Sequence, residues 1–446
     1  MSCQSIDAKF QLPQRYQGQI QSFWDEYIQL TLKYKPMNLG LGFTDGPVPQ
    51  YITDALAAAA KSPNSIVNQY TRGSGHPRLI QALSTLYSQL VDRKIDPINE
   101  MLITIGAYEA LYATIQGHVD EGDEVIIIEP FFECYEPMVK ICGGVPRFIP
   151  LRLNNTTTSS NSEINSSDYV LDDGELEGLF NEKTKMIILN TPNNPLGKVF
   201  SRIELTKIAE LCQKYNVLCV SDEVYEWMIF DDNKHIRICT LPGMWERTIT
   251  IGSAGKTFSV TGWKTGWAYG PANLIINLKM VHQNCVYNCP TPIQEAIAII
   301  FEGEIKRLDS PACYFNVLAA ELKKKRDFMA EFLNENGMKP IIPQGGFFMT
   351  ANWSALENKA DLSTELDTQQ DFRFTKWMIK NVGVLAMPPS AFFSDTNKSM
   401  MEHFVRYCFF KTDENLQTAA NILKEWTGKV MTIRQNCLPA PPNDSI

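Results

Sequence analysis

Between residues 51 and 300, short apolar runs rich in β-branched residues alternate with longer segments in which apolar residues recur at helical spacing. The runs are EMLITIG (100–106), DEVIIIEP (123–130), TKMIILN (184–190), NVLCVSDEV (216–224) and RTITIGSA (247–254). They are typical of buried strands, and the segments between them predict helices. This alternation predicts an α/β fold, a mostly parallel sheet with helices on both faces. In such folds, ligands bind beyond the carboxyl ends of the strands.

The C-terminal third predicts a second, smaller α+β domain. A long helical segment at 314–337 precedes strand-like runs at 339–353 and 403–411. The polar stretch NNTTTSSNSEINSS (154–167) predicts a surface excursion that buries nothing. The expected parts are an N-terminal segment that packs with the small domain (1–45), a large domain (46–302), the small domain (303–430) and a tail (431–446).

Composition and charge exclude several classes of function. The 446 residues carry a formal net charge of −9, which argues against a general nucleic-acid or anionic-membrane surface. The basic run KKKR (323–326) predicts the solvated face of a helix. No apolar run approaches the roughly 20 residues of a membrane span. The start of the sequence resembles neither a secretory signal nor a transit peptide, so we expect a cytoplasmic protein. The 11 cysteines lack metal-ligand spacing, so we expect buried free thiols and no metal site.

Residues that could bind a ligand follow the first predicted strands. Ala107 and Tyr108 begin a helix, where free N–H groups and the helix dipole favour a phosphate, although a plain strand-to-helix turn fits equally well. Phe132 follows the next strand and fits either core packing or stacking on a flat ligand. Asn190 and Asn194 lie in NTPNNPLG, where asparagine also simply favours a turn.

The last two strands end at groups that need partners. Asp222, with Tyr225 three residues later, is a carboxylate at the end of a buried strand. The stretch SAGKTFSVTGWKTGW (253–267) contains Lys256 and Lys264, and a lysine between buried strands can lose its proton near neutrality and become a nucleophile. Its S-x-x-K and K-T-G fragments match serine β-lactamases but lie too close together for that family. A phosphate site, a stacking ring, a carboxylate and a lysine together indicate pyridoxal phosphate (PLP), which needs a Schiff-base lysine and an anion at its ring nitrogen.

Longer motifs carry a family resemblance. NTPNNPLGK, SDEVYEWM and SAGKTFSVTGWKTGW, in this order, resemble the class I PLP-dependent aminotransferases of fold type I. NQYTRGSGHP, DEGDEVIIIEPFFECYEPM and KPIIPQGGFF narrow the resemblance to the kynurenine aminotransferases, also described as glutamine transaminase K and cysteine-S-conjugate β-lyase. The resemblance runs from Trp24 to Trp426 and implies a homodimer with active sites shared across the interface.

The resemblance also implies a role for each residue that contacts the cofactor. Lys256 would form the Schiff base and move the proton between Cα of the substrate and C4′ of PLP. Asp222 would pair with the pyridine nitrogen, while Asn194 and Tyr225 would donate to the phenolate oxygen. The other contacts are a ring stack from Phe132, phosphate contacts from Ser253, Lys264 and the backbone of Ala107 and Tyr108, and a phosphate contact from Tyr70 of the other subunit.

The implied substrate contacts leave the choice of amino acid open. Arg406 in FVRYCF would clamp the α-carboxylate, helped by Asn190 and the backbone of Gly42. Without the resemblance, an arginine in a strand fits a structural ion pair. The implied pocket and mouth residues are Trp24, Tyr287 and Asn288, the last two standing where the family often has a histidine.

The implied reaction is a ping-pong transamination in which L-kynurenine gives its amino group to a 2-oxo acid and yields kynurenic acid. One alternative is a broad glutamine and aromatic transaminase with cysteine-S-conjugate β-lyase side activity. Another is a PLP-binding regulator without catalysis. Such regulators carry an added DNA-binding domain, whereas only about 45 residues precede the core here.

Overall fold

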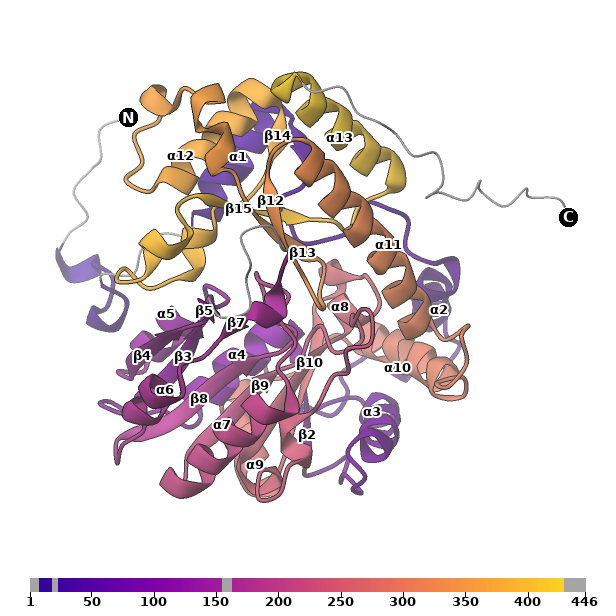
Figure 1. The fold of residues 1–446 in the computed structure, drawn as a ribbon. Coiled ribbons are helices and arrows are strands. Elements are labelled where there is room, and N and C mark those ends of the chain that lie inside the picture. Colours follow the sequence, from indigo (N-terminus) through magenta and orange to yellow (C-terminus); the bar gives the residue numbers. More distant parts are fainter. Residues whose placement is uncertain (1–7, 18–22, 155–162, 429–446) are drawn as a thin grey trace, which may run out of the picture.

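A seven-stranded sheet lies at the centre of the larger part of the molecule (Figure 1). The computed structural model describes residues 8–17, 23–154 and 163–428. The strand order is β2-β11-β10-β9-β8-β3-β4, and the pairs are parallel except those that β11 forms with β2 and β10. The strands are β2 (Met101–Ile105), β3 (Glu124–Glu129), β4 (Val145–Pro150), β8 (Thr184–Asn190), β9 (Leu218–Asp222), β10 (Thr248–Ser253) and β11 (Thr265–Tyr269). Each of the five apolar runs contains one strand, so the predicted mostly parallel sheet is confirmed.

Helices cover both faces of this sheet because successive strand residues point to opposite sides. In β2, Leu102 packs with α4 and α9, whereas Met101 and Ile103 pack with α3 and α10. Farther along the sheet, α6 and α7 pack on Ile126 and Ile187. The helices of this part are α2 (Gln50–Ala60), α3 (Pro77–Leu90), α4 (Gly106–Gln116), α5 (Tyr135–Ile141), α6 (Asp173–Leu179), α7 (Arg202–Tyr215), α8 (Ala254–Thr257), α9 (Ala272–Cys285) and α10 (Thr291–Ile305).

A smaller part, at the top of Figure 1, is built on a four-stranded sheet in the order β15-β13-β12-β6. Helix α1 packs here, where Tyr27 shares a buried cluster with Ile379 and Leu385, and β1 pairs with β14. The strands are β1 (Met37–Asn38), β6 (Ile164–Asn165), β12 (Lys339–Ile342), β13 (Phe348–Asn352), β14 (Val384–Leu385) and β15 (Phe404–Cys408), and a separate pair is β5 (Arg152–Leu153) with β7 (Tyr169–Val170). The helices are α1 (Trp24–Tyr34), α11 (Tyr314–Glu335), α12 (Gln370–Trp377) and α13 (Asp413–Thr427).

The expectation that the polar stretch 154–167 buries nothing is wrong at its C-terminal end. Ile164 pairs with Ile341 of β12, and Ser166 is fully buried. The hydroxyl of Ser166 donates to the carbonyl oxygen of Gly197 at 3.2 Å. A polar residue can be buried here because its hydrogen bond is satisfied. Residues 155–162 of the stretch lie outside the described residues.

The expectation that KKKR (323–326) is a solvated face is wrong for its last two residues. Lys325 and Arg326 lie in α11, and both are buried. The Lys325 ammonium lies 2.7 Å from a carboxylate oxygen of Asp413, and an Arg326 guanidinium nitrogen lies 2.6 Å from one of Asp231. Pairing of this kind makes buried charge tolerable, and a charge count along the sequence does not show it.

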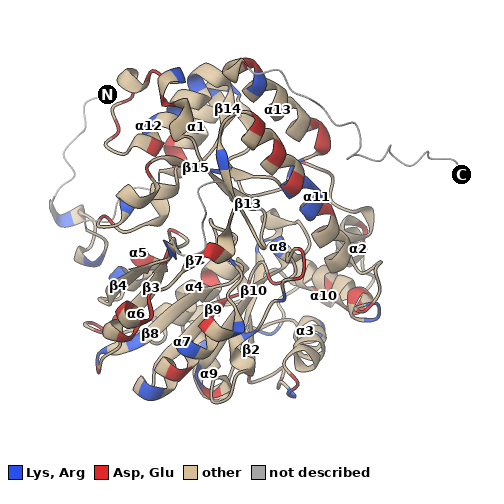
Figure 2. Ribbon diagram, viewed as in Figure 1, with Lys and Arg blue, Asp and Glu red and all other residues tan. Residues whose placement is uncertain are grey.

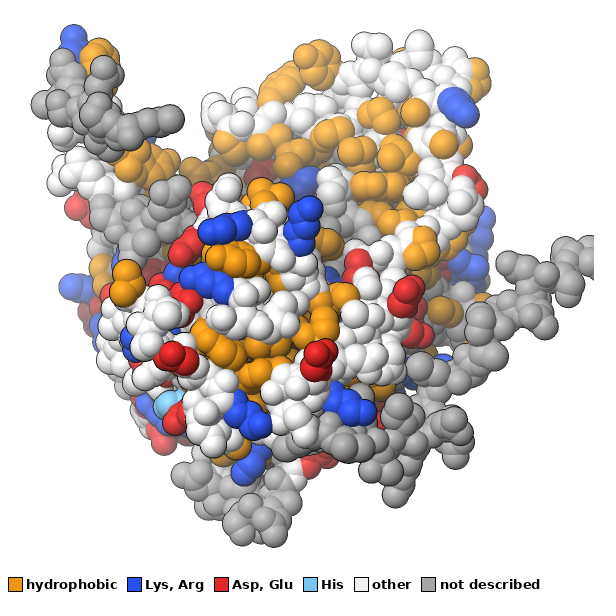
Figure 3. Space-filling model, turned by 90° about the horizontal axis from the view of Figure 1, so that it is seen from above, with side chains coloured by type: hydrophobic (Ala, Val, Ile, Leu, Met, Phe, Trp, Pro, Cys, Tyr) orange, Lys and Arg blue, Asp and Glu red, His pale blue; other side chains and the backbone are white. Residues whose placement is uncertain are grey.

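Acidic and basic residues are interspersed on the same helices (Figure 2). Figure 3, which looks onto the molecule from the top of Figure 1, shows hydrophobic side chains exposed among charged ones. No helix within the described residues combines the length and apolarity needed to cross a membrane. The nine cysteines of the described residues are all free, and seven of them are buried.

Candidate active site

A cavity of about 260 Å³ lies beyond the carboxyl ends of the central strands, where the large sheet faces the smaller part of the molecule. Such a volume lies near the lower end for small-molecule sites. Of the sixteen residues predicted for the site, thirteen line this cavity. They are Trp24, Gly42, Ala107, Tyr108, Phe132, Asn190, Asn194, Asp222, Tyr225, Ser253, Lys256, Lys264 and Arg406.

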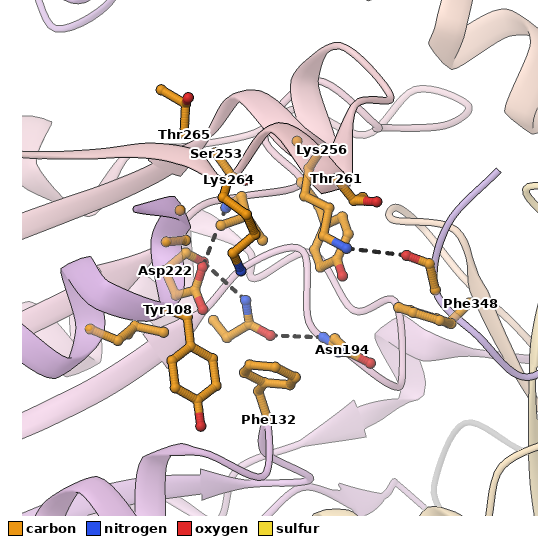
Figure 4. A pocket seen from close by; sticks show the side chains of 18 of the residues that line it. Tyr108, Phe132, Asn194, Asp222, Ser253, Lys256, Thr261, Lys264, Thr265 and Phe348 are labelled. Atoms are coloured by element: carbon orange, nitrogen blue, oxygen red, sulfur yellow. Dashed lines mark hydrogen bonds between the residues drawn. The ribbon is translucent and has the colours of Figure 1, made fainter. Parts of the chain in front are cut away.

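Lys256 extends into the cavity from α8, directly after β10 (Figure 4). Its ammonium lies 3.3 Å from the carbonyl oxygen of Gly42 and about 5.0 Å from the ring centre of Phe347. Desolvation is the largest cause that lowers the pKa of Lys256, to about 8. About a tenth of this amine is therefore unprotonated, and thus nucleophilic, at pH 7.

Asp222 ends β9 and is buried at the floor of the cavity. Burial raises the pKa of its carboxyl to about 6, against the hydrogen bond that Tyr135 donates to Oδ2 at 2.6 Å. A cationic ring nitrogen beside this carboxylate would relieve the cost of its burial. Sequence analysis missed Tyr135. The only signal was its place in the first turn of a helix shortly after β3, and nothing local shows that it reaches β9.

Arg406 lies in β15 and enters the cavity from the opposite side. Its side chain is buried, with the guanidinium carbon 4.0 Å from the ring centre of Phe348. One terminal nitrogen donates to Oδ1 of Asn194 at 3.0 Å, the other donates to the carbonyl of Gly40 at 3.1 Å, and Nε is buried without a partner. Burial lowers the pKa of Arg406 to about 10.

The hydrogen-bond partners of Arg406 are an amide and a backbone carbonyl, and no ion pair among the described residues includes it, so the alternative of a structural ion pair is wrong within them. A buried guanidinium without a carboxylate, aimed into a cavity, suits an anionic ligand.

The amides of the turn after β8 are partly engaged with protein groups. Asn190 donates to the backbone carbonyl of Asp222 at 3.0 Å and accepts from the backbone N–H of Asn194 at 2.7 Å. Its role toward a substrate stays a prediction. Because Oδ1 of Asn194 accepts from Arg406, the amide nitrogen of Asn194 is the atom that can donate to a ligand oxygen.

The start of α4 and Lys264 form one end of the cavity. Gly106 has a φ of 71°, and a Cβ on it would lie 3.5 Å from Nζ of Lys264, in the space between helix and ammonium. The backbone of β11 reaches α4 only because Gly266 has no side chain: a Cβ there would lie 2.4 Å from the nitrogen of Ala107. The expectation that both lysines are enclosed between strands is wrong for Lys264, which is exposed and adopts a left-handed φ of 49°.

Trp24 is held against the cavity by a residue that sequence analysis missed. Its indole N–H donates to Oε1 of Glu133 at 2.7 Å, and the other carboxylate oxygen of Glu133 is buried without a partner. Burial raises the pKa of Glu133, and the charge of Arg406 opposes the shift. Glu133 directly follows Phe132, but its partner Trp24 is more than a hundred positions away, so no local pattern reveals the pair.

Three predicted residues lie outside the cavity. Tyr70 is 83% exposed and Tyr287 is 62% exposed, with their ring centres 6.4 Å apart. Asn288 donates to the backbone carbonyl of Thr71 at 2.7 Å. Within one chain these residues form a separate surface, at the loop that carries Tyr70.

A mostly parallel sheet, covered on both faces, carries Lys256 and Asp222 at its strand ends, and Arg406 faces them from β15; this arrangement suits an aminotransferase. The model of the family "aminotransferase class I and II" matches residues 34–423, and the chain belongs to this family. It is 51% identical over 423 residues to human kynurenine–oxoglutarate transaminase 3, covering 95% of this chain and 92% of that protein. It is 46% identical over 405 residues to human kynurenine–oxoglutarate transaminase 1, covering 90% and 95%.

A solved structure gives the same result for the fold. The crystal structure of Bna3p from Saccharomyces cerevisiae matches with a TM-score of 0.84 and 31% identity, over 92% of this chain and 97% of that chain. The fold class expected from the sequence, fold type I with a smaller α+β part, is confirmed. The resemblance to the kynurenine aminotransferases is likewise confirmed by the relatives.

Proposed function

We propose that this aminotransferase uses PLP to move an amino group from L-kynurenine to a 2-oxo acid, yielding kynurenic acid, and that it also accepts glutamine, methionine and aromatic amino acids. The observation that carries the proposal is one cavity that combines the low-pKa amine of Lys256, the buried carboxyl of Asp222 and the unpaired Arg406. The names of the relatives support kynurenine and oxoglutarate as substrates.

The donors around the cavity fit PLP. The space between α4 and Lys264, which a Cβ at position 106 would fill, suits a phosphate held by Ser253, Lys264 and the N–H groups at the start of α4. Asp222 is the anion for the ring nitrogen, Phe132 offers a ring to stack on, and Asn194 and Tyr225 are the donors for the ring oxygen. When bound, PLP supplies an electron-accepting ring that makes the Cα proton of an amino acid acidic.

Lys256 serves as both nucleophile and proton carrier. Its lowered pKa supplies a free amine that can attack a carbonyl carbon near neutral pH. Nζ of Lys256 would hold PLP as a Schiff base and, when free, would be the base that takes the proton from Cα of the substrate and delivers it to C4′ of the cofactor. The contact of Nζ with the carbonyl oxygen of Gly42 keeps the amine at the substrate side of the cavity between these steps.

Arg406 orients the substrate for this proton transfer. Its unpaired Nε and its terminal nitrogens can bind the α-carboxylate, while Asn194 and the carbonyl of Gly40 hold the guanidinium plane. A fixed carboxylate limits rotation about the Cα bonds and so presents one proton to Lys256. Trp24, held by Glu133, is the wall against which an aromatic side chain would pack.

The active unit proposed is a homodimer in which Tyr70 of one subunit completes the phosphate site of the other. A tyrosine that is 83% exposed on a loop fixed by hydrogen bonds is suited to contact a second chain. Tyr287 beside it is also exposed. In this assembly Tyr287 and Asn288 would lie at the substrate mouth of the other subunit.

Kynurenic acid formation from L-kynurenine with a panel of 2-oxo acids tests the proposal. The Lys256→Ala variant should lose turnover. Lys279→Ala is the matched control, because desolvation also lowers the pKa of Lys279 to about 8 but its amine lies outside the cavity, bonded to the carbonyls of Ile98 and Asn99. Turnover of glutamine, methionine or cysteine S-conjugates without kynurenine would instead support the broad transaminase and β-lyase alternative.

A further inference from the structure

Residues 69–73, which we call the Tyr70 loop, pack against one stretch of chain that runs from the end of α9 to the start of α10. Three side chains of this stretch contact backbone carbonyls of the loop. The contacts are His282 Nε2 with Gly73 at 2.9 Å, Asn288 with Thr71 at 2.7 Å and Thr291 with Gln69 at 2.5 Å. His282 has the lowest exposed fraction of the three side chains, 2%, against 4% for Thr291.

His282 also contacts the helix that begins at the proposed phosphate site. Its Nδ1 lies 2.6 Å from Oε1 of Glu109, in the first turn of α4. The second oxygen of Glu109 accepts the backbone N–H of Ile105 at 2.6 Å, at the junction of β2 and α4. Both ring nitrogens of His282 thus face oxygens, one on the Tyr70 loop and one on α4, so the ring connects these two elements.

Cys289 is the third member of this buried cluster, close enough for Glu109, His282 and Cys289 to resemble a metal site. However, both nitrogens of His282 and both oxygens of Glu109 already lie within hydrogen-bonding distance of protein atoms. A cation would have to break these contacts, so the geometry favours a hydrogen-bonded bridge.

We propose that His282 is a positioning residue that acts across the dimer: by fixing the Tyr70 loop to Glu109 on α4, it places the Tyr70 hydroxyl for the phosphate site of the other subunit. The inference rests on the proposed function and its dimer. Each active site would thus depend on the internal packing of the neighbouring chain. A defect at His282 is expected in the site opposite, because Tyr70 does not line the cavity of its own chain.

A double-mutant cycle on PLP affinity tests this placement. Tyr70→Phe removes one hydrogen bond to a charged group, which weakens PLP binding by about 10- to 100-fold. His282→Phe should weaken it by about fivefold in the wild type and by less than twofold in the Tyr70→Phe background, since the effect passes through Tyr70. His118→Gln, at the other end of α4 with its ring bonded to the carbonyl of Thr114, is the matched control and should leave affinity unchanged.

Mixed dimers show the direction of the effect. When one subunit carries Lys256→Ala, only the other retains the lysine of its site. His282→Phe placed in the Lys256→Ala subunit should weaken PLP binding at the intact site opposite. The same substitution placed in the intact subunit should weaken binding at its own site less than at the site opposite, because there it acts only through the contact of Glu109 with the start of α4. If His282→Phe does not give a folded dimer, His282→Gln, which keeps one donor, replaces it in the same cycle.

Several results would overturn the inference. Additive costs of Tyr70→Phe and His282→Phe would mean that His282 does not act through Tyr70, and a defect confined to its own subunit would reverse the direction. One equivalent of zinc retained by the purified protein and lost in the His282 variant would identify a metal site. A wild type that binds no PLP or sediments as a monomer would instead refute the proposed function itself.

Discussion

Replacing Asp222 with asparagine should stabilise the cofactor-free protein while it removes activity. Burial raises the pKa of this carboxyl from 3.8 to about 6. At about 1.4 kcal/mol for each pKa unit, the ionised side chain lowers the free energy of unfolding by about 3 kcal/mol above pH 6. Asparagine keeps an oxygen that can accept from Tyr135 but carries no charge, so Asp222→Asn should gain up to that amount at pH 8.

The sign of the pH dependence makes this prediction specific. A carboxyl whose pKa is raised on folding binds its proton more tightly in the native state, so the penalty is full above pH 6 and fades as the pH falls toward 3.8. The advantage of Asp222→Asn should therefore drop to about half at pH 5. Urea unfolding of the cofactor-free proteins at pH 8 and pH 5 measures both values, with Asp309→Asn, an exposed aspartate, as the control.

Two outcomes would refute the reasoning. An Asp222→Asn protein that is no more stable than the wild type at pH 8 would show that the buried charge is already compensated by groups such as Tyr135. A gain of the same size at pH 5 and pH 8 would show that the charge of Asp222 is not its cause.

Further substitutions test other parts of the site. Arg406→Lys keeps the charge but loses the planar fork, and should raise KM for amino acids and 2-oxo acids about 10-fold or more with PLP affinity unchanged, as steady-state kinetics and PLP titration would show. Gly266→Ala puts a Cβ 2.4 Å from a backbone nitrogen of α4 and should weaken PLP binding and lower the urea midpoint, whereas Gly262→Ala, in open space, should do neither. Tyr135→Phe removes a hydrogen bond that lowers the pKa of Asp222, so the acidic limb of the pH profile of kcat/KM should move up by about one pH unit; an unmoved limb would assign that limb to another group.

The parts of the site that the sequence predicted are those set by local chain geometry. Asp222 and Lys256 were located because each directly follows an apolar run, and the end of a buried strand is visible in sequence. Tyr135 and Glu133 were missed because their partners, Asp222 and Trp24, are about a hundred residues away. Such pairs depend on how helices pack across the sheet. The spacing of apolar residues along the sequence does not show this packing.

The same limit explains two of the errors in burial. Ser166 and Lys325 belong to polar stretches, and hydropathy alone places them in solvent. In the fold, each satisfies its polar group with a distant partner, a backbone carbonyl for Ser166 and both a carbonyl and Asp413 for Lys325. Burial of a polar side chain is decided by whether a partner is available, which is a property of the tertiary structure.

The active-site cavity combines three charges that the protein alone leaves poorly compensated. Burial disfavours the charged form of each group, raising the pKa of Asp222 to about 6 and lowering those of Lys256 to about 8 and Arg406 to about 10. A ligand that brings a cationic ring nitrogen to Asp222, a carbonyl carbon to Lys256 and a carboxylate to Arg406 relieves all three costs at once. These three groups lack a charge partner in the free protein. They therefore favour binding of cofactor and amino acid together, because the cofactor and the amino acid supply the missing partners.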